Sequence, residues 1–305
     1  MEINETTILD TRGFIKINGD EAKSFLQNII TNDIEKIADK LTLFSSIFTP
    51  QGKYLYEFFI LKFEDGYLLE CEKKVTSEII KIFNFYKLRA KVNLIDVSKK
   101  YTNIIISLEK FKEIMKTQHV KNSTLSCEEG STLSCENERI YVDPRHKDLG
   151  AKIITKVENI KNIIEKLNLK KIDIKNYYEK SFTLGIPQLN LSKLKDKIFG
   201  IENNLDELGG IDFKKGCYIG QENTSRIKLR NKLRRRILPV KKITGEINED
   251  DIIKFNGNEI GKIMINEPYP FALIKVVNPN LKEFIDIELT CGSSKIKILK
   301  PNWIS

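Results

Sequence analysis

The residues best suited to chemistry lie in one stretch, FKKGCYIGQENTSRIKLRNKLRRR, which covers 213–236. Within it, Cys217 follows Gly216 and is three residues before Gly220, so the backbone around the thiol is free to bend sharply or to approach a ligand closely. A thiol in such a turn is a candidate reactive group. A cysteine that only packs in a tight turn has the same pattern, and residue types alone favour that interpretation.

Cations flank this thiol in the sequence. Lys214 and Lys215 come just before Cys217, and Arg226 follows nine residues after it. If these side chains are also close to the sulfur in space, their charge favours the thiolate and makes it reactive.

The sequence lacks the residues and motifs that several other catalytic chemistries require. The chain has two histidines, His119 and His146, and the second lies in DPRHKDLG, which is typical of an Asp-Pro turn with a surface histidine and not of a catalytic base. The sequence contains neither the phosphate loop G-x-x-x-x-G-K-[ST] nor the fingerprint G-x-G-x-x-G, which excludes P-loop nucleotide hydrolysis and NAD-dependent redox chemistry. Gln221 and Glu222, directly after the thiol turn, have the donors and acceptors to bind the edge of a heterocycle.

Cations are concentrated after the thiol turn. Five of the nine arginines and four lysines fall in 226–242, where no acid occurs. From 226 to 234 cations alternate with residues that are mostly apolar, and this period of two predicts a strand with a basic face. Such a face binds carboxylates or phosphates, although an edge strand guarded by cations has the same pattern. Nucleic acid is the weaker candidate, because no aromatic residues for base stacking interleave with the cations.

The secondary-structure pattern is mixed over 1–236. Because predicted hairpins interleave with amphipathic helices, we expect an α+β fold and not a doubly wound parallel sheet. Alternation predicts strands at 14–19, 43–63 (two strands joined by Pro50-Gln51-Gly52), 67–71, 91–96 and 102–108, and helical spacing predicts helices at 20–34, 75–90 and 157–168. After about residue 237, short strands and an Asn256-Gly257 hairpin signal predict a small all-β terminal domain, a barrel or curled sheet.

A near-perfect tandem repeat, STLSCEE at 123–129 and STLSCEN at 131–137, carries Cys127 and Cys135. The spacing fits no structural zinc pattern, and no histidine or further cysteine pair completes a set of ligands. We interpret the repeat as a slipped duplication in an exposed loop, and we expect no metal site.

The composition indicates a soluble globular protein, with 41% hydrophobic and 30% charged residues, and the length of 305 residues favours two domains. No apolar run approaches the roughly 20 residues that cross a bilayer, so we expect no membrane contact. Five widely spaced cysteines argue against a disulfide framework and for a reducing compartment. Together with the acidic, polar start MEINETTILD, which excludes a secretory signal and argues against a transit peptide, these features predict a cytoplasmic protein.

The segment LGGIDFKKGCYIGQE, which ends at Glu222, resembles the signature of the YgfZ-type folate-binding proteins, relatives of the glycine-cleavage T-protein (aminomethyltransferase). The similarity runs along most of the chain, since INGDEAKSFLQNIITNDIEKI, DPRHKDLGAKI, LGIPQLN and ENNLDEL follow one another in the family's order. The resemblance implies a T-protein-like folate-binding domain over 1–236, with two mixed α/β subdomains that meet near 100–140, and a C-terminal β-barrel over 237–305.

The resemblance also implies a cofactor, partners and site residues. The cofactor is tetrahydrofolate or another folate derivative, and the partners are iron–sulfur client or assembly proteins, with tRNA-modifying enzymes among the clients. The signature cysteine matches Cys217, and the catalytic aspartate of the T-protein, in a G-G-x-x-D-D pattern, matches Glu57 in GKYLYEF. The residues that the resemblance places at the folate are Tyr177, Thr183, Glu202, Lys215, Gly216, Tyr218, Gly220, Gln221 and Glu222. We add Arg226 to the folate site because the basic face, read from periodicity, would attract an anionic folate tail.

Departures from the family pattern bear on activity. Glu57 is one methylene longer than aspartate, and the acid beside it is replaced by Tyr56. A base displaced by about 1 Å loses on the order of a hundredfold in rate, which argues against efficient aminomethyl transfer. Thr183 stands where the relatives have a pterin-facing glutamate, Ser181 stands where they have an arginine, and Gly200 replaces a proline.

Three functions follow, in this order. The first is a folate-dependent accessory factor for iron–sulfur cluster assembly or repair that uses Cys217 and does not hold a cluster stably, because the chain lacks four well-spaced cysteines. The second is a tetrahydrofolate-dependent aminomethyl or one-carbon transferase with Glu57 as its base. The third is a non-enzymatic RNA-binding module at 226–236. The sequence leaves open whether the chain is an enzyme.

Overall fold

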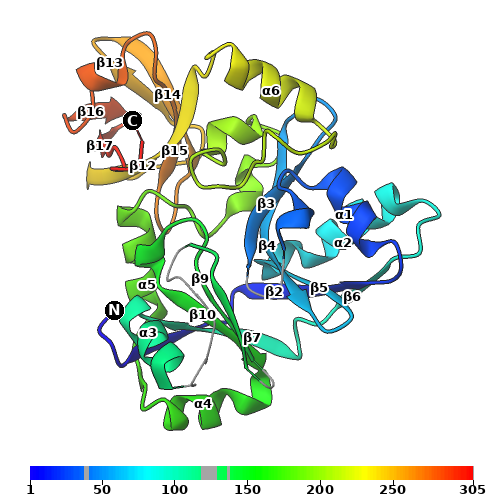
Figure 1. Ribbon diagram of the computed structural model, residues 1–305. Coiled ribbons are helices and arrows are strands. Elements are labelled where there is room, and N and C mark those ends of the chain that lie inside the picture. Colours follow the sequence, from blue (N-terminus) through cyan, green and yellow to red (C-terminus); the bar gives the residue numbers. More distant parts are fainter. Residues whose placement is uncertain (38–40, 118–128, 136–137, 305) are drawn as a thin grey trace. The chain divides into compact units, whose positions relative to one another are not determined.

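The computed structural model describes residues 1–37, 41–117, 129–135 and 138–304 (Figure 1). The chain forms two compact units. The first unit comprises Met1–Ile47, Glu57–Tyr177 and Leu208–Tyr218, and the second comprises Phe48–Tyr56, Tyr178–Glu207 and Ile219–Ser305. The division after residue 218 falls inside KKGCYIGQE, so the thiol belongs to the first unit and Gly220 to the second.

A five-stranded sheet with helices α1 and α2 forms one part of the first unit. The strands lie in the order β3-β4-β5-β2-β6. Phe25 of α1 and Phe58 of β4 both pack edge-on against Phe83 of α2, with ring centroids 5.8 and 6.1 Å apart. The bounds are β2 (Arg12–Asn18), α1 (Ala22–Ile29), β3 (Leu43–Phe48), β4 (Tyr54–Phe63), β5 (Gly66–Glu72), α2 (Thr76–Lys87) and β6 (Asn93–Asp96), which confirms the elements expected over 14–96.

A six-stranded sheet, in the order β11-β1-β7-β10-β9-β8, forms the other part of the first unit. Helices α3 and α4 pack on it through Phe111, Ile114 and Ile163, which share a buried core with Ile104 and Ile153. The bounds are β1 (Glu5–Leu9), β7 (Tyr101–Ile106), α3 (Leu108–Thr117), β8 (Thr132–Cys135), β9 (Glu138–Val142), β10 (Ala151–Lys156), α4 (Ile160–Lys166) and β11 (Lys170–Lys171).

The described part of the second copy, 131–135, does not form the exposed loop that the repeat predicts. It forms edge strand β8, in which Thr132 pairs with Tyr141 of β9 and Leu133 is buried in the core of the sheet. Thr132 and Leu133 are 3% and 5% exposed, so packing into the sheet determines the structure here more than the repetition does. Cys127 and most of the first copy lie outside the described residues.

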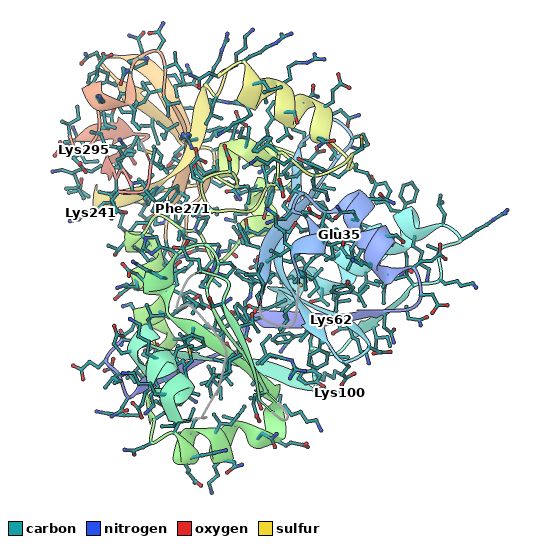
Figure 2. All side chains as sticks on the ribbon, in the orientation of Figure 1. Glu35, Lys62, Lys100, Lys241, Phe271 and Lys295 are labelled. Atoms are coloured by element: carbon teal, nitrogen blue, oxygen red, sulfur yellow. The ribbon has the colours of Figure 1, made fainter. Side chains whose placement is uncertain are left out.

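The predicted all-β tail is a closed six-stranded barrel, β12-β15-β14-β13-β16-β17. Asn256 and Gly257 both have positive φ angles, +49° and +79°, as a two-residue type I′ hairpin requires. Lys241 and Lys295 lie on strands of this barrel (Figure 2). Its strands are β12 (Arg235–Thr244), β13 (Ile252–Phe255), β14 (Asn258–Ile265), β15 (Phe271–Lys275), β16 (Leu289–Cys291) and β17 (Ser294–Ile298). The predicted α+β fold with a C-terminal barrel is confirmed.

The basic segment after the thiol turn is a helix and not the predicted strand. Helix α6 (Gln221–Leu229) covers its first part, and β12 begins only at Arg235. Lysine, arginine and leucine are good helix formers, and Glu222 pairs with Arg226 one turn later. The alternation of cations and apolar residues does not indicate a strand here, because the segment buries little surface. Leu229, which the pattern assigns to an apolar face, is 85% exposed.

The remaining helices lie between the elements described above in chain order. They are α5 (Ile174–Thr183) and the short 3-10 helices η1 (Ile34–Lys36), η2 (Lys73–Val75), η3 (Lys147–Leu149), η4 (Val157–Asn159), η5 (Leu191–Leu194), η6 (Gly200–Asn203) and η7 (Leu281–Glu283).

Candidate functional site

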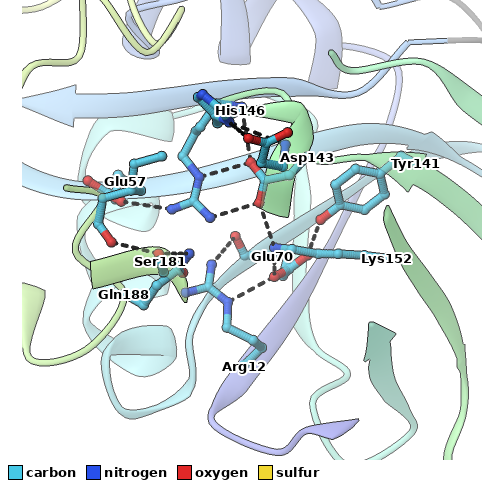
Figure 3. A network of polar contacts seen from close by, with 12 residues as sticks. Arg12, Glu57, Glu70, Tyr141, Asp143, His146, Lys152, Ser181 and Gln188 are labelled. Atoms are coloured by element: carbon cyan, nitrogen blue, oxygen red, sulfur yellow. Dashed lines mark hydrogen bonds and ion pairs between the residues drawn. The ribbon is translucent and has the colours of Figure 1, made fainter. Parts of the chain in front are cut away.

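A buried network of charged side chains forms the polar centre of the first unit (Figure 3). Each member is less than one-tenth exposed, and three cations face three carboxylates, so the buried charges balance. The network joins strands of both sheets of this unit. Its members are Arg12 on β2, Glu57 on β4, Glu70 on β5, Lys152 on β10, Tyr141 on β9, and Asp143 and Arg145 just after β9.

Glu70 is at the centre of the network. Its Oε1 atom accepts hydrogen bonds from Arg12 Nε at 2.8 Å and from Lys152 Nζ at 2.9 Å, and its Oε2 atom accepts one from the Tyr141 hydroxyl. Burial by itself would raise the pKa of Glu70, but Lys152 and Arg12 outweigh this effect and lower it to about 2. Glu70 is therefore an anion at neutral pH.

Lys152 is the one cation of the network whose pKa is lowered. Burial lowers the pKa of Lys152 to about 8, although Glu70 and Asp143 act in the opposite direction. Its Nζ atom lies 3.8 Å from the centre of the Phe59 ring and 3.9 Å from Asp143 Oδ2. The ammonium group is thus enclosed by an aromatic face and two carboxylates.

In the Asp143-Pro144-Arg145 segment, the Asp143 carboxylate binds both the backbone and the side chain of Arg145. Asp143 Oδ1 accepts a hydrogen bond from the backbone N–H of Arg145 at 3.0 Å, which closes a local turn. The two side chains also form a bidentate ion pair, with Nε–Oδ1 at 3.0 Å and Nη2–Oδ2 at 2.8 Å. The guanidinium lies 4.7 Å from the centre of the Phe59 ring. Arg145 is therefore held in one orientation.

Two predicted site residues, Glu57 and Tyr177, surround Arg145. Glu57 is 8% exposed, and its Oε1 atom is 3.9 Å from Arg145 Nη1. Tyr177 is 2% exposed and interacts electrostatically with the same guanidinium. Burial raises the pKa of the Tyr177 hydroxyl, so the phenol is neutral. The structure thus brings these two residues together, and their catalytic and folate-binding roles stay predictions.

Lys215 has a structural role in the thiol turn. It is 7% exposed, and its ammonium donates hydrogen bonds to the carbonyl oxygens of Gln27 and Ile30 at 2.7 Å and of Asn32 at 3.0 Å. These carbonyls lie at and just beyond the C-terminal end of α1, where a cation is favourable. An ammonium has three N–H bonds, and Lys215 uses all of them here.

Cys217 differs from the other cysteines whose side chains the structure describes. It is exposed, whereas Cys71 and Cys291 are buried. Burial raises the pKa of the Cys71 thiol to about 12 and that of Cys291 to about 11, so both are protonated and unreactive at neutral pH. Tyr218, next to Cys217, is buried, with the Lys215 ammonium 5.1 Å from its ring centre.

The two glycines of the signature have different roles. Gly220 has a φ of +81°, and a Cβ atom there would lie 2.4 Å from the carbonyl oxygen of Thr49. Glycine is therefore required at 220 for contact with the turn between β3 and β4. At Gly216 a Cβ atom would meet nothing within 4 Å, and φ is not positive. The glycine-specific backbone conformation is found at Gly220, and the space for a close approach is found at Gly216.

Further predicted residues lie in the second unit, on α6 and η6. Gln221 and Glu222 begin α6, and Glu222 Oε1 pairs with Arg226 Nη2 at 2.7 Å on the exposed side of the helix. Glu202 is buried, and its Oε1 atom accepts a hydrogen bond from Arg235 Nε at 2.8 Å. These acids have partners within the protein, so their contribution to a ligand site stays a prediction.

Thr183, at the end of α5, also belongs to the second unit. Its side chain is exposed, and its hydroxyl donates a hydrogen bond to the carbonyl oxygen of Glu179 at 2.9 Å, within its own helix. Ser181, which stands where relatives have an arginine, is buried, and its hydroxyl donates to Ile186 O at 2.7 Å. Contact between Thr183 and a pterin stays a prediction.

Arg12, Glu70 and Lys152 were not among the predicted site residues. A usable signal existed, because Glu70 lies among apolar residues in YLLEC and Lys152 does so in GAKII. A charge inside a buried strand needs a compensating partner. The partners themselves are 58 and 82 residues away along the chain, and only the folded structure pairs them.

Two further sequence expectations concern metals and membranes. In the part of the chain that the structure describes, no group of three or more histidine, cysteine or acidic side chains is arranged to hold a metal ion. None of the described helices is both long and apolar enough to cross a membrane. The side chains of Cys127 and Cys135 are outside the described part.

Comparison with known proteins gives both sequence relatives and a structural one. No family model matches the chain. It is 29% identical over 261 residues to the mitochondrial "iron-sulfur cluster assembly factor IBA57 homolog" of Dictyostelium discoideum, covering 76% of this chain and 61% of that protein. It is 26% identical over 249 residues to the protein of the same name in Coccidioides immitis, covering 76% and 55%. The chain thus spans a little over half the length of these relatives.

The fold is that of a solved aminomethyltransferase. The structure superposes on the glycine cleavage system aminomethyltransferase T from Bartonella henselae with a TM-score of 0.75, covering 98% of this chain and 86% of that one. The sequence identity is 11%, so the likeness is one of fold. The expected T-protein-like architecture is confirmed.

The relatives correct the predicted compartment. Their names place them in the mitochondrion, and this overturns the prediction of a cytoplasmic protein. The cysteine argument distinguishes reducing from oxidising compartments only, so it does not separate the cytoplasm from another reducing compartment.

Proposed function

Because the chain is a T-protein-like homologue of the IBA57 iron–sulfur cluster assembly factors, we propose that it takes part in assembling or repairing iron–sulfur clusters, with Cys217 as its functional thiol. The similarity to these relatives, over three quarters of this chain, carries the proposal. Its partners are then iron–sulfur assembly or client proteins, and the resemblance adds tRNA-modifying enzymes as clients.

The placement of the cysteines supports Cys217 in this role. Transfer of sulfur, a metal ion or a redox equivalent requires a thiol that a partner reaches, and Cys217 is exposed. Cys71 and Cys291 are buried with raised pKa values and do not meet this requirement.

Complementation tests the role of the thiol. Cells that lack their own factor are supplied with the wild-type chain, Cys217→Ala or Cys291→Ala, and the activity of iron–sulfur enzymes is measured. We expect Cys217→Ala to fail although its folding and abundance are normal, and Cys291→Ala to retain activity. Full rescue by Cys217→Ala would refute the assignment of the thiol.

The proposal includes tetrahydrofolate as the cofactor, which the T-protein-like fold and the signature around Cys217 support. Calorimetry of the purified chain with tetrahydrofolate measures binding directly. A Thr183→Val variant should bind several-fold more weakly if the hydroxyl contacts the pterin, because one hydrogen bond contributes about 1 kcal/mol. The absence of binding heat would remove folate from the proposal and leave the cluster-assembly role to the complementation test.

A second candidate is a folate-dependent aminomethyl transferase, which the fold of the Bartonella enzyme favours. In that function Glu57 would hold or deprotonate the reacting amine. Glu57 faces Arg145 at 3.9 Å, so its charge is already compensated within the protein. Formation of methylene-tetrahydrofolate from an aminomethyl donor, abolished in Glu57→Gln, would support the transferase. Bound folate without turnover would exclude it.

A further inference from the structure

A groove with a volume of about 790 Å³ lies in the second unit, between α6 with the turn that follows it, η6, and the end of β15. Its walls combine apolar and cationic side chains. Ile227, Leu233 and Val277 supply apolar surface, and Val277 is 60% exposed. Lys232 and Arg234 add two exposed cations.

The cations of this region fall into two classes. Several have partners within the protein: Arg235 pairs with Glu202 at 2.8 Å, and Lys275 Nζ donates to the carbonyl oxygen of Glu259 at 2.8 Å. The side chains of Lys232 and Arg234 form no hydrogen bond or ion pair with any residue that the structure describes. The groove therefore has two uncompensated positive charges beside exposed apolar surface.

We propose that this groove binds an acidic, amphipathic segment of a partner protein, which is an interaction beyond the proposed function and independent of it. Carboxylates of the segment pair with Lys232 and Arg234, and its apolar side chains cover Ile227, Leu233 and Val277. The two cations would orient an acidic segment as it approaches, because opposite charges attract. The buried apolar contacts would then hold the complex together.

The shape of the region indicates how the segment binds. All six strands of the barrel are paired on both sides, so the partner cannot add a strand to a free edge and must bind through side chains. Four of the lining residues, Lys232, Arg234, Val277 and Asn278, are exposed, so we expect one side of an occupant to stay in water. That suits a segment of a larger protein, whereas sites for small molecules enclose most of their ligand.

The chemistry of the walls disfavours nucleic acid. Single-stranded nucleic acids need aromatic faces for their bases as well as cations for their phosphates. Phe199 is the aromatic residue of the groove, and the Lys53 ammonium lies over its ring, 4.1 Å from the centre. A phosphate backbone would also leave the apolar wall uncovered.

The test measures binding of a fluorescein-labelled 12-residue peptide, half glutamate and half leucine or isoleucine, to the full chain by fluorescence anisotropy. Charge reversal in Lys232→Glu/Arg234→Glu should weaken binding about tenfold or more. The matched control is Lys241→Glu/Lys242→Glu, which changes the net charge equally at two exposed cations of β12 outside the groove, and it should change the affinity less than about twofold.

Other probes define the results that would overturn the proposal. Peptides with lysine in place of glutamate, or serine in place of the apolar residues, should bind at least tenfold more weakly. Equal losses in the two double variants would show diffuse attraction and refute the groove. Tighter binding of a 12-nucleotide single-stranded RNA than of the acidic peptide would refute the partner class, and equal binding of the serine peptide would refute the role of the apolar wall. Because none of these probes contains folate or a cluster, their failure leaves the Cys217 experiment unaffected.

Discussion

Single residues of the first unit show what buried charges require. Glu70 is enclosed by Arg12, Lys152 and Tyr141, and the Asp143 carboxylate is used entirely within the protein. The free energy of such a network depends on its completeness, because a charge left without its partner is far more costly than the intact pair. Loss of one member should therefore destabilise the unit in which Cys217 and Glu57 lie.

Replacing Glu70 by Gln should therefore lower the free energy of unfolding by about 3–5 kcal/mol, because Arg12 and Lys152 lose a fully buried counter-ion. Urea denaturation measures the change. Glu64→Gln is the matched control, since Glu64 is about half exposed and pairs with Lys16 at the surface, where a loss of less than about 1 kcal/mol is expected. Equal losses in the two variants would contradict the account of the network.

At the scale of elements, the thiol turn is anchored to the end of α1. Three carbonyl oxygens there accept the hydrogen bonds of the Lys215 ammonium, so the signature lysine positions the backbone that carries Cys217. Burial lowers the pKa of Lys215 to about 8, although Asp33 and Asp212 raise it. The lysine is thus a positioning residue of the turn.

Lys215→Met should destabilise the protein by about 1–3 kcal/mol, because buried carbonyl groups lose their donor while the aliphatic volume is kept. Lys214→Met, at the exposed neighbouring position, should be within about 0.5 kcal/mol of the wild type. Thermal and urea unfolding of both variants provide the comparison. A stable Lys215→Met protein that fails to bind tetrahydrofolate would instead indicate a ligand contact for Lys215.

The signature glycines provide a second pair of variants. Gly220→Ala should cost more than about 1 kcal/mol, because the new Cβ atom would lie 2.4 Å from Thr49 O at a positive φ. Gly216→Ala should leave the stability unchanged or slightly higher, since its Cβ atom would meet nothing within 4 Å. Circular dichroism against urea measures both. A folded Gly216→Ala protein without activity would identify 216 as a position where a ligand or partner approaches the backbone.

At the scale of the whole molecule, buried carboxylates determine how stability depends on pH. The pKa values of Glu70 and Asp143 are both lowered on folding: burial alone would raise them, but Lys152 and Arg12 outweigh it for Glu70, and Arg145 and Lys152 do so for Asp143. A group whose folded pKa is lowered stabilises the protein fully above its unfolded pKa, and this stabilisation is lost as the pH falls toward the folded value.

The free energy of unfolding should therefore decrease as the pH falls from about 4.5 to about 2, with Glu70 alone contributing on the order of 3 kcal/mol. Urea titrations at a series of pH values measure the slope. The Glu70→Gln variant should show a shallower acid dependence than the wild type in this range. An unchanged slope would mean that Glu70 is not the group that titrates.

Features that depend on residues close together in the sequence could be predicted, and features that depend on distant residues could not. The thiol turn was identified from the types and spacing of Cys217 and its neighbours, and the barrel from its strand and turn pattern, because these signals are local. The strand predicted at 226–236 was wrong, since a surface segment with little buried area lacks the packing that makes periodicity informative.

The α+β class, the terminal barrel, the family resemblance and the choice of Cys217 as the residue to test all came from the amino-acid sequence. Each of these depends on residue type and order within short stretches. The folded structure was needed to find that Lys215 binds the end of α1, that Gly216 has open space around it, and that Glu70 pairs with both Arg12 and Lys152. These features depend on which distant strands and turns come into contact in the fold. Buried charge, hydrogen bonding and steric contact arise between such segments and cannot be read from any one of them.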